Sequence, residues 1–313
     1  MHLLIPFASG LSEAANQVLC DLSLPRLARL LTRLTPTERD EGDEYSFTPP
    51  HERALAAAWG WHGTDGVWPW AAHAAARDGI EVGQQPWGLI TPAHWHVGRD
   101  HVTLADPAAL HLDAEESRAL FEAVRHLFES EGFALTWGGA LRWYAAHESL
   151  AALPSAALDR VIGRNVELWM RGDTTTHPRT RLIRRLQSEL QLLLYPHPIN
   201  EAREARGELA VNSFWLSGCG RHQPADESAV TVNQSLRAPM LAQDWAAWAE
   251  AWRALDGGDL AALLTRAEAG KPATLTLCGE RSAQRLANTR QSPWKRLARR
   301  WQGMEPHTAL EAL

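Results

Sequence analysis

The sequence predicts an α/β protein in which short buried strands alternate with amphipathic helices, interrupted by a segment of α+β character. Short apolar runs bounded by glycine or proline recur along the 313-residue chain, which is typical of buried strands. Between them, apolar residues recur at three- and four-residue spacing, as in helices that pack on a sheet. The length exceeds that of one simple domain, which favours one large elaborated domain or two domains.

The N-terminal part is predicted as a strand, a loop and helices. An apolar run at 2–8 ends in a Ser-Gly pair, and leucines at helical spacing continue to Leu34. Residues 35–50 are polar, acidic and bounded by proline, so we expect an exposed loop there. Two further helices are expected, at 50–60 and 71–78.

The character of the sequence changes at Trp87, and we expect an α+β domain at 87–210 inserted into a core domain formed by 1–86 and 211–313. Asp113, with a glutamate three residues later, predicts a helix start. A Gly-Gly pair after Trp137 predicts a hairpin. The expected elements are strands at 87–91 and 95–103, a helix at 113–132, hairpin strands at 133–137 and 140–145, and a long basic helix beginning near Arg179.

After residue 210 the α/β alternation resumes. Trp245, Trp248 and Trp252 lie at three- and four-residue spacing and predict a packing stripe on one helix face. The chain holds 15 tryptophans, and their other clusters are typical either of a core or of a partner surface. Expected elements are strands at 211–216, 229–232 and 273–278 and helices at 244–255 and 259–269.

Composition narrows the class of protein. No apolar run approaches the ~20 residues that a membrane span needs, and no basic region precedes the first apolar run, so we expect a soluble, cytoplasmic protein without a membrane partner. Cys20, Cys219 and Cys278 lie far apart and predict three reduced thiols. The net charge of −6 argues against nucleic acid as the main partner.

The segment 197–220 is the most informative part of the chain. Proline stops the preceding helix, a polar turn follows, and the apolar strand at 211–216 opens into a Gly-x-Gly loop at Gly218 and Gly220. In open α/β sheets ligands lie beyond the carboxyl ends of strands, so this loop is a candidate ligand edge. A tight connection between a strand and a helix explains the same spacing, and both interpretations stay open.

Histidines provide a second candidate site. On a strand, His94 and His96 would share one face, as a metal chelate requires, but no carboxylate or cysteine stands at a familiar ligand spacing. A packed or solvated histidine face is the alternative, and we predict no metal. His177 and His197 flank the basic helix and suit either an anion or helix-end packing. The sequence contains no Gly-x-Ser-x-Gly element, no Walker loop and no His-Glu-x-x-His element.

The C-terminal stretch is basic, and Trp294, Leu297 and Trp301 fall on one face of a predicted amphipathic helix. Such a helix can dock on its own protein, on a protein partner or on an acidic surface. Its basic residues and those just before it are Arg281, Arg285, Arg290, Lys295, Arg296, Arg299 and Arg300.

The segment 197–220 resembles a motif of the archaeal-type cofactor-independent phosphoglycerate mutases, in which His-Pro-x-Asn-x-x-Arg leads through Gly and Ala-Asn into Trp-x-x-Gly-x-Gly. Segments 90–124 and 8–30 resemble the inserted domain and the first loop and helix of that family. The opening and the length also resemble the proteobacterial RpfE-type regulatory proteins. The matching motif positions are His197, Pro198, Asn200, Arg203, Gly207, Asn212, Trp215, Gly218 and Gly220.

This resemblance implies an alkaline-phosphatase-like fold, with a mixed sheet core flanked by helices and interrupted by a smaller α+β insert. Family enzymes place an aspartate at the end of the first strand to hold a divalent metal, whereas here that strand ends in Ile5-Pro6-Phe7. Their late Asp-His pairs have no counterpart, and the strand before the basic stretch ends in Cys278-Gly279-Glu280. Phosphoryl transfer in this family needs the cations to activate the serine and offset charge.

We therefore expect a catalytically deficient protein that acts as a ligand-binding or regulatory module without a cofactor. The expected ligand is a small phosphorylated or other anionic molecule, bound by backbone N–H groups near Gly218 together with Arg203 or Arg206. The expected ligand-binding residues are His197, Asn200, Arg203, Arg206, Asn212, Trp215, Gly218 and Gly220.

Two alternatives stay open. One is an active phosphoglycerate mutase or phosphatase that uses Mn²⁺ or Mg²⁺ with ligands such as His94, His96 and Asp100. The other is a protein–protein interaction module that uses the basic C-terminal helix.

Overall fold

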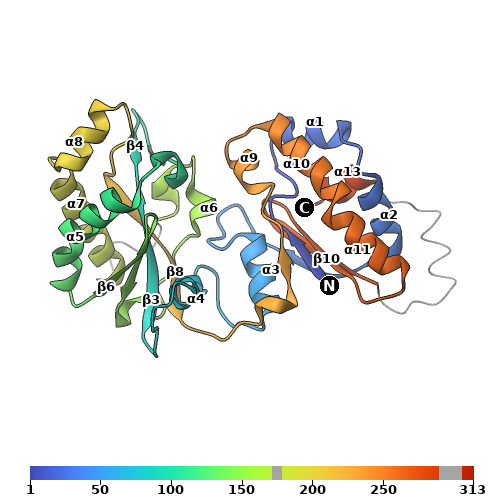
Figure 1. Ribbon diagram of the computed structural model, residues 1–313, viewed down its shortest axis with the longest axis horizontal. Coiled ribbons are helices and arrows are strands. Elements are labelled where there is room, and N and C mark those ends of the chain that lie inside the picture. The colour runs from blue at the N-terminus through green and yellow to red at the C-terminus, as the bar shows by residue number, and fades with distance from the viewer. Residues whose placement is uncertain (171–177, 289–304) are drawn as a thin grey trace. The chain divides into compact units, whose positions relative to one another are not determined.

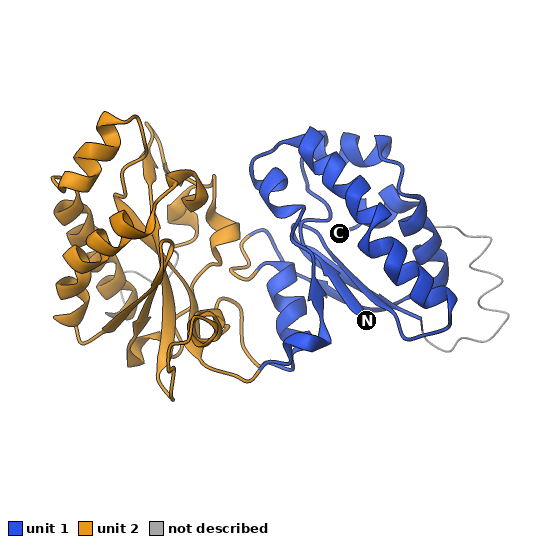
Figure 2. Cartoon of the chain, in the orientation of Figure 1, with its two compact units in different colours: residues 1–44, 49–61, 225–313 blue, residues 45–48, 62–224 orange. Residues whose placement is uncertain are grey.

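The computed structural model describes residues 1–170, 178–288 and 305–313. They form two compact units, shown in separate colours in Figure 2. Unit 1 comprises residues 1–44, 49–61 and 225–313, and unit 2 comprises residues 45–48 and 62–224. Both units contain a sheet with helices against it, which confirms the predicted α/β class with a mixed sheet flanked by helices. Within the described residues, none of the helices combines the length and apolar content that a membrane crossing requires.

Unit 1 is built on a five-stranded mixed sheet. Its strands are β1 (His2–Ile5), β2 (Thr35–Glu41), β9 (Thr231–Val232), β10 (Thr274–Cys278) and β11 (Ser282–Ala287). They lie in the order β2-β11-β10-β1-β9, with β1 parallel to both of its neighbours and the β10-β11 and β11-β2 pairs antiparallel. Leu3, Leu4 and Ile5 are completely buried, as expected for a central parallel strand that is covered on both faces.

Helices pack around this sheet, as Figure 1 shows. The described helices of unit 1 are α1 (Glu13–Asp21), α2 (Pro25–Arg33), α3 (Pro50–Ala58), α9 (Arg237–Leu241), α10 (Trp245–Gly257), α11 (Asp259–Glu268) and α13 (Pro306–Glu311), with the 3₁₀ helix η4 (Glu227–Ala229). Leu27, Leu30 and Leu263 belong to one apolar core with the strand residue Leu275. The leucine spacing of α2 and α11 therefore places their apolar faces toward the sheet.

A carboxylate from α10 caps α2. The N-cap position of α2 is Leu24, whose side chain makes no capping hydrogen bond. The buried Asp256 side chain accepts hydrogen bonds from the backbone N–H groups of Arg26 and Leu27, the latter at 2.9 Å. Acceptors at a helix N-terminus satisfy backbone donors that have no partner within the helix. Asp256 therefore fixes α2 against α10.

The tryptophan stripe of α10 is a packing stripe, as predicted. Trp248 and Trp252 are 0% exposed, and their rings meet edge to face with centroids 6.4 Å apart. Trp245 packs partly buried against Trp248. These indoles fill the space between α10 and the sheet, because each aromatic side chain buries a large apolar area.

Unit 2 is built on a four-stranded antiparallel sheet. Its strands are β3 (Pro86–Ala93), β6 (Ala134–Gly139), β7 (Arg142–Ala146) and β8 (Ser213–Arg221), in the order β6-β7-β3-β8. A separate ribbon consists of β4 (Trp95–Val97) and β5 (Val102–Leu104). The predicted hairpin is confirmed, since β6 and β7 pair directly, but the glycine pair ends β6 and the turn lies at residues 140–141.

The unit 2 sheet carries helices on both faces. Its described helices are α4 (Trp70–Arg77), α5 (Ala114–Glu129), α6 (Leu158–Val161), α7 (Pro178–Leu194) and α8 (Pro198–Ala205), with the 3₁₀ helices η1 (Pro107–Leu110), η2 (Glu148–Leu150) and η3 (Val166–Leu168). Along β7, Trp143 joins the core formed with α5 and α7, whereas its neighbour Tyr144 joins the cluster formed with α4. Alternation along a strand explains this division between two faces. The Asp113 side chain accepts a hydrogen bond from the N–H of Glu116, so the predicted start of α5 is confirmed.

Three predicted elements were wrong. Residues 35–41 form the edge strand β2 rather than a loop, because their backbone pairs with β11 while their side chains stay mostly exposed and show no apolar pattern. Residues 95–103 do not form one strand, since the chain turns back between β4 and β5. The polar segment after Pro196 is not a turn but contains the helix α8, which begins with Pro198 at its first position.

The boundaries of the two compact units differ from those of the predicted insert, 87–210. Unit 2 extends from residue 62 to residue 224. The physical reason lies in β8, which pairs along its length with β3, and in α4, which packs on both of these strands.

Candidate functional site

The carboxyl end of β1 is the position at which an α/β sheet most often binds its ligand. Here that end is packed with apolar groups. The carbonyl oxygen of Phe7 accepts a hydrogen bond from Trp248 Nε1 at 3.1 Å, and its ring lies 5.1 Å from the ring of His51. Phe7 has a φ of 58°, a left-handed conformation that is uncommon for a bulky residue. The backbone after β1 is therefore held in place by packing in unit 1.

Cys278, at the end of the neighbouring β10, is also committed to the core. The side chain is completely buried, and this burial raises the pKa of the thiol well above its usual value. A thiol must lose its proton to act as a nucleophile or a metal ligand. Cys278 therefore remains a neutral thiol near pH 7.

His94 and His96 lie side by side, with ring centroids 4.5 Å apart. His94 Nδ1 is 2.7 Å from the carbonyl oxygen of Ala210, and burial lowers the pKa of His94 despite that hydrogen bond. In the described residues, no group of three or more His, Cys, Asp or Glu side chains is arranged to hold a metal ion. Within the described residues, His94 and His96 therefore have no third side chain beside them that would complete a metal site.

The first residues of the motif at 197–220 fasten α8 to unit 2. His197 caps α8 by accepting from the N–H of Ile199 at 3.3 Å, and burial lowers the pKa of its imidazole. The buried Asn200 amide donates to the carbonyl oxygens of Leu194 and Val211 and accepts from the N–H of Val211 at 2.8 Å. Asn200 therefore holds the end of α7 and the start of the next strand together.

Arg203 and Arg206 meet around one carboxylate. Arg203 is completely buried and pairs with Glu116 of α5 while also donating to the carbonyl oxygens of Leu209 and Leu110. Arg206 lies 2.6 Å from both Glu116 and Glu208. A buried guanidinium needs such partners because an unpaired charge is costly away from water.

The last residues of the motif lie elsewhere in unit 2, away from α8. Gly218 lies against α4, and Figure 1 shows that α4 and α8 are far apart in this unit. Asn212 exchanges hydrogen bonds with the backbone of Trp95, at 2.7 and 3.0 Å. Gly218 has a φ of 66°, and a Cβ there would approach the backbone nitrogen of Ala71 to 2.8 Å. Because β8 continues to Arg221 instead of ending at Ser217, the expected loop at a strand end was wrong. The glycines allow α4 to approach the strand closely.

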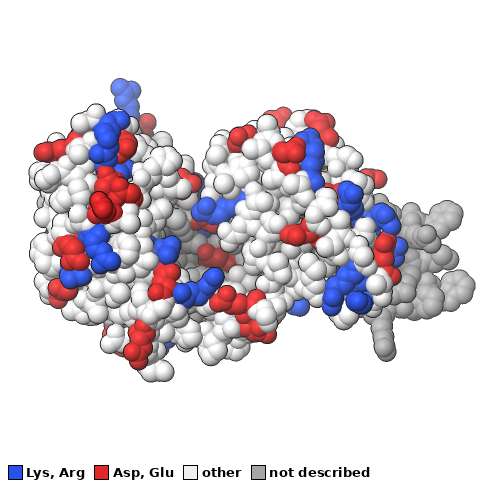
Figure 3. Space-filling model, in the orientation of Figure 1, with Lys and Arg blue, Asp and Glu red and all other residues white. Residues whose placement is uncertain are grey.

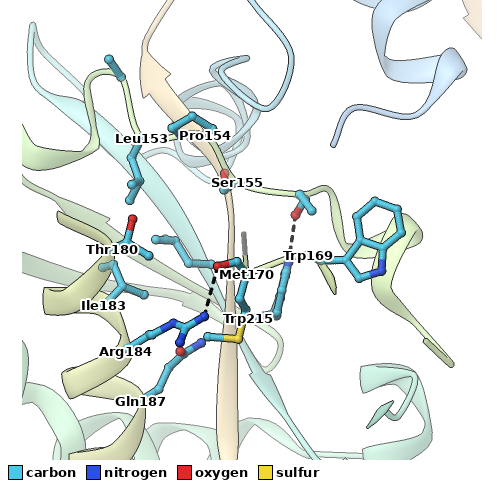
Figure 4. A pocket seen from close by; sticks show the side chains of 13 residues that line it. Leu153, Pro154, Ser155, Trp169, Met170, Thr180, Ile183, Arg184, Gln187 and Trp215 are labelled. Carbon is cyan, nitrogen blue, oxygen red and sulfur yellow. Dashed lines mark hydrogen bonds between the residues drawn. The ribbon is translucent and has the colours of Figure 1, made fainter. Parts of the chain in front are cut away.

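A cavity of about 290 Å³ lies in unit 2 between α7, β8 and the segments 152–156 and 169–170. This volume is near the lower end of the range of about 300–1,000 Å³ for small-molecule sites. Figure 4 shows α7 and β8 contributing side chains to it. The walls are mainly apolar, and their larger members are Leu153, Trp169, Met170, Ile183, Trp215 and Leu216.

Polar side chains of α7, among them Arg184 and Gln187, line this cavity, together with Ser155 from the segment 152–156. Gln187 is 6% exposed, and its Nε2 donates to the carbonyl oxygen of Phe214 at 3.2 Å. Arg184 is half-buried, and its Nη2 donates to the carbonyl oxygen of Met170 at 3.3 Å (Figure 4). Gln187 Oε1 and Arg184 Nε are buried without a hydrogen-bond partner among the described residues. Unpaired buried polar atoms beside a cavity indicate that a bound molecule can complete their hydrogen bonds.

Only Trp215 belongs both to the predicted site and to the cavity. Its Nε1 donates to the carbonyl oxygen of Ala156 at 2.8 Å, which fixes the indole as a wall. Sequence reasoning missed Arg184 and Gln187 because they read as ordinary polar positions of an amphipathic helix. The apolar walls come from separate segments, so no spacing along the chain marks them.

Surface charge shows no region of a single sign on the face in Figure 3, where acidic and basic side chains intermingle in each unit. Arg281 and Arg285 pair with Glu44 and Glu38. The remainder of the basic C-terminal stretch, from Arg290 to Trp301, and His177 lie outside the described residues.

No family model matches the sequence, and no curated protein matches it. The structure is similar to the cofactor-independent phosphoglycerate mutase from Thermoplasma acidophilum, with 13% identity and a TM-score of 0.34 over 93% of this chain and 90% of that chain. It is also similar to the PH0037 protein from Pyrococcus horikoshii, with 12% identity and a TM-score of 0.42 over 91% of this chain and 86% of that chain. Similarities at this level carry no information about the site or its chemistry.

Proposed function

We propose that this protein is a binding or regulatory module whose small-molecule ligand occupies the cavity of unit 2, and that it does not catalyse metal-dependent phosphoryl transfer. The observation that carries the proposal is the Oε1 atom of Gln187, which lies in a mainly apolar cavity and has no hydrogen-bond partner among the described residues, on a side chain that is only 6% exposed. Concave apolar sites with a few convergent polar groups are the usual form of a small-molecule site. Membership of the RpfE-type regulatory group is part of the same proposal.

Two features support binding without chemistry. Burial raises the pKa of the Cys219 thiol in β8 to about 12, so this sulfur stays protonated near pH 7. In unit 1 the residues after β1 serve packing, with Phe7 tied to Trp248 by a hydrogen bond. A protonated thiol is not the activated nucleophile that covalent catalysis needs.

Occupancy of the cavity can be tested with indole as a probe, using saturation-transfer NMR on the full chain. Ile183→Trp would fill the cavity, and we expect it to abolish the indole signal. Leu192 lies on the same helix but is 76% exposed, so Leu192→Trp is the matched control and should preserve the signal. Equal signals from the two variants would overturn the assignment of the ligand to this cavity.

An active metal-dependent mutase or phosphatase is the second candidate, favoured by the contact between the His94 and His96 rings. Phosphoglycerate mutase turnover should be measured with Mn²⁺ or Mg²⁺ added, together with the metal content of the purified protein. We expect no turnover. Robust activity that chelation abolishes, with about one or two cations bound per chain, would establish the enzyme instead.

The anion site at His197, Arg203, Arg206 and Gly218 stays a prediction. Glu116 already occupies the guanidinium groups of both arginines, so an anion would have to compete with that carboxylate. A crystal soaked with 3-phosphoglycerate and manganese tests it, since density for the anion at Arg206 or Gly218 would support the predicted site.

The interaction of a protein partner with the basic C-terminal helix also stays a prediction. Removing the residues after Ser292 should abolish capture of a partner while the rest of the chain stays folded. Unfolding of the truncated protein would instead show that the segment is part of the core.

A further inference from the structure

The polar atoms of the cavity specify the chemistry of its ligand, and this inference rests on the function proposed above. Gln187 presents an acceptor. Its Nε2 donates to the carbonyl oxygen of Phe214, which cannot itself donate, so the carboxamide keeps its nitrogen toward β8 and Oε1 finds no donor in the part of the chain that the structure describes. A buried acceptor of this kind calls for an N–H or O–H group on the ligand.

Arg184 presents a donor and a positive charge one helical turn away. Among the described residues, its Nε has no hydrogen-bond partner and no carboxylate forms an ion pair with its guanidinium. Figure 4 shows the Arg184 and Gln187 side chains leaving α7 on the same side. Because three residues separate them, they are neighbours on one helix face. A half-buried guanidinium near apolar walls favours an anionic acceptor, above all a carboxylate.

The walls favour a flat apolar body. Trp215 is held by its hydrogen bond to Ala156, and one face of Trp169 is covered by the Arg160 guanidinium, 5.0 Å from the ring centroid. Both indoles are at most 5% exposed and line the cavity. Rigid aromatic walls stabilise aromatic rings through stacked or edge-to-face contacts.

We propose that the cavity binds an aromatic carboxylic acid that also carries an N–H or O–H donor. The carboxylate pairs with Arg184, the donor pairs with Gln187 Oε1, and the ring lies between the apolar walls. Arg184 and Gln187 would favour this ligand over a purely apolar one, because only a ligand with both polar groups can pair with both side chains.

Three probes test the proposal by isothermal titration calorimetry on the full chain. Indole-3-acetate has the ring, the carboxylate and the N–H donor, 1-naphthaleneacetate lacks the donor, and 3-methylindole lacks the carboxylate. We expect indole-3-acetate to bind about tenfold more tightly than either of the others, because each loses one hydrogen bond to a buried group.

Two variants locate these preferences. Gln187→Leu should reduce the affinity for indole-3-acetate to that for 1-naphthaleneacetate, whose own affinity stays unchanged and so reports an intact cavity. Arg184→Met should remove the preference for indole-3-acetate over 3-methylindole. Arg185→Met is the matched control, since Arg185 is ion-paired with Glu131 and Glu189 at the surface, and it should leave all three affinities unchanged.

The outcomes separate the two proposals. Equal affinities for the three probes would overturn the ligand class but leave the cavity as a binding site. Tightest binding of 3-methylindole would overturn the role of the carboxylate. No binding of any probe would overturn both the ligand class and the proposed function.

Discussion

Units 1 and 2 use their buried side chains differently. In unit 1 the central parallel strands are covered by tightly packed apolar groups, with Trp248 and Trp252 completely buried and Phe7 bonded to Trp248. In unit 2 the packing between α7 and β8 leaves a cavity beside which one polar atom each of Arg184 and Gln187 has no hydrogen-bond partner among the described residues.

This difference shows that the topology of a sheet and the location of a candidate binding site are separate matters in this protein. The strand end in unit 1 has the topology at which α/β proteins usually bind ligands, yet its residues stabilise the core. The cavity in unit 2 lies beside an antiparallel sheet and has the chemical character of a site. The position of a strand end therefore says less about function than the side chains that surround it.

The largest change in stability is expected when the buried, charged side chain of Arg203 in unit 2 is removed. Arg203→Ala should lower the free energy of unfolding by about 3–5 kcal/mol, because it takes the donor away from the carbonyl oxygens of Leu110 and Leu209 and removes the buried partner of Glu116, which keeps only its ion pair with the exposed Arg206 among the described residues. Urea denaturation measures the loss. Arg185→Ala, which removes an exposed ion pair of the same unit, should cost no more than about 1 kcal/mol. Similar losses in the two variants would show that burial of Arg203 contributes nothing.

The close approach of α4 to β8 predicts the next effect. Gly218→Ala should cost about 2–4 kcal/mol, since it adds a steric clash with Ala71 to the strain of a left-handed alanine. Gly207 has a φ of 74° but open space around it, so Gly207→Ala should cost about 1 kcal/mol from strain alone. The difference between their unfolding free energies measures the packing of the helix on the strand, and no difference would exclude that packing.

A pH-dependent effect is expected in unit 1. Burial, together with the charges of Arg285 and the N-terminus, lowers the pKa of His2 to about 4. Because the unfolded chain binds this proton near pH 6.5 and the folded chain near pH 4, stability is lost as the pH falls through that interval. His2→Gln should recover up to about 1–2 kcal/mol of that loss, allowing for partial exposure. Parallel stability curves for variant and wild type between pH 7 and 4 would contradict it.

The smallest effect compares two tryptophans in the same core. Trp248 Nε1 donates to the carbonyl oxygen of Phe7, whereas Trp252 Nε1 has no hydrogen-bond partner among the described residues. Trp248→Phe should therefore cost about 0.5–1.5 kcal/mol more than Trp252→Phe, since only the first leaves a backbone acceptor unpaired. Thermal unfolding of both variants gives the comparison, and the reverse order would mean that the Phe7 contact does not stabilise unit 1.

Local signals predicted much of the fold. Asp113 marked the start of α5, the glycine pair after Trp137 marked the hairpin, and the tryptophan spacing marked the buried face of α10. These features depend on residues close in sequence, so their spacing is sufficient. The strand β2 escaped prediction because its partner β11 follows more than 240 residues later, and an exposed edge strand shows no apolar alternation.

The candidate site could not be predicted in the same way. The motif residues Asn200 and Arg203 stand out in the sequence, but in the structure they bond to backbone carbonyls and to Glu116. Gln187 does not stand out, because a polar residue within a helix usually faces water. Its burial depends on β8, which supplies the carbonyl partner Phe214 from a distant part of the chain.

The sequence by itself determined the alternation of strands and helices, the apolar end of the first strand and the packing face of the tryptophan helix. These follow from side-chain size, polarity and periodicity, which act over a few residues. Only the tertiary structure decided that α4 packs against Gly218 and that Arg184, Gln187 and Trp215 line one cavity. Such sites arise where distant segments meet, and the unpaired hydrogen-bonding atoms that define them exist only once those segments have excluded water.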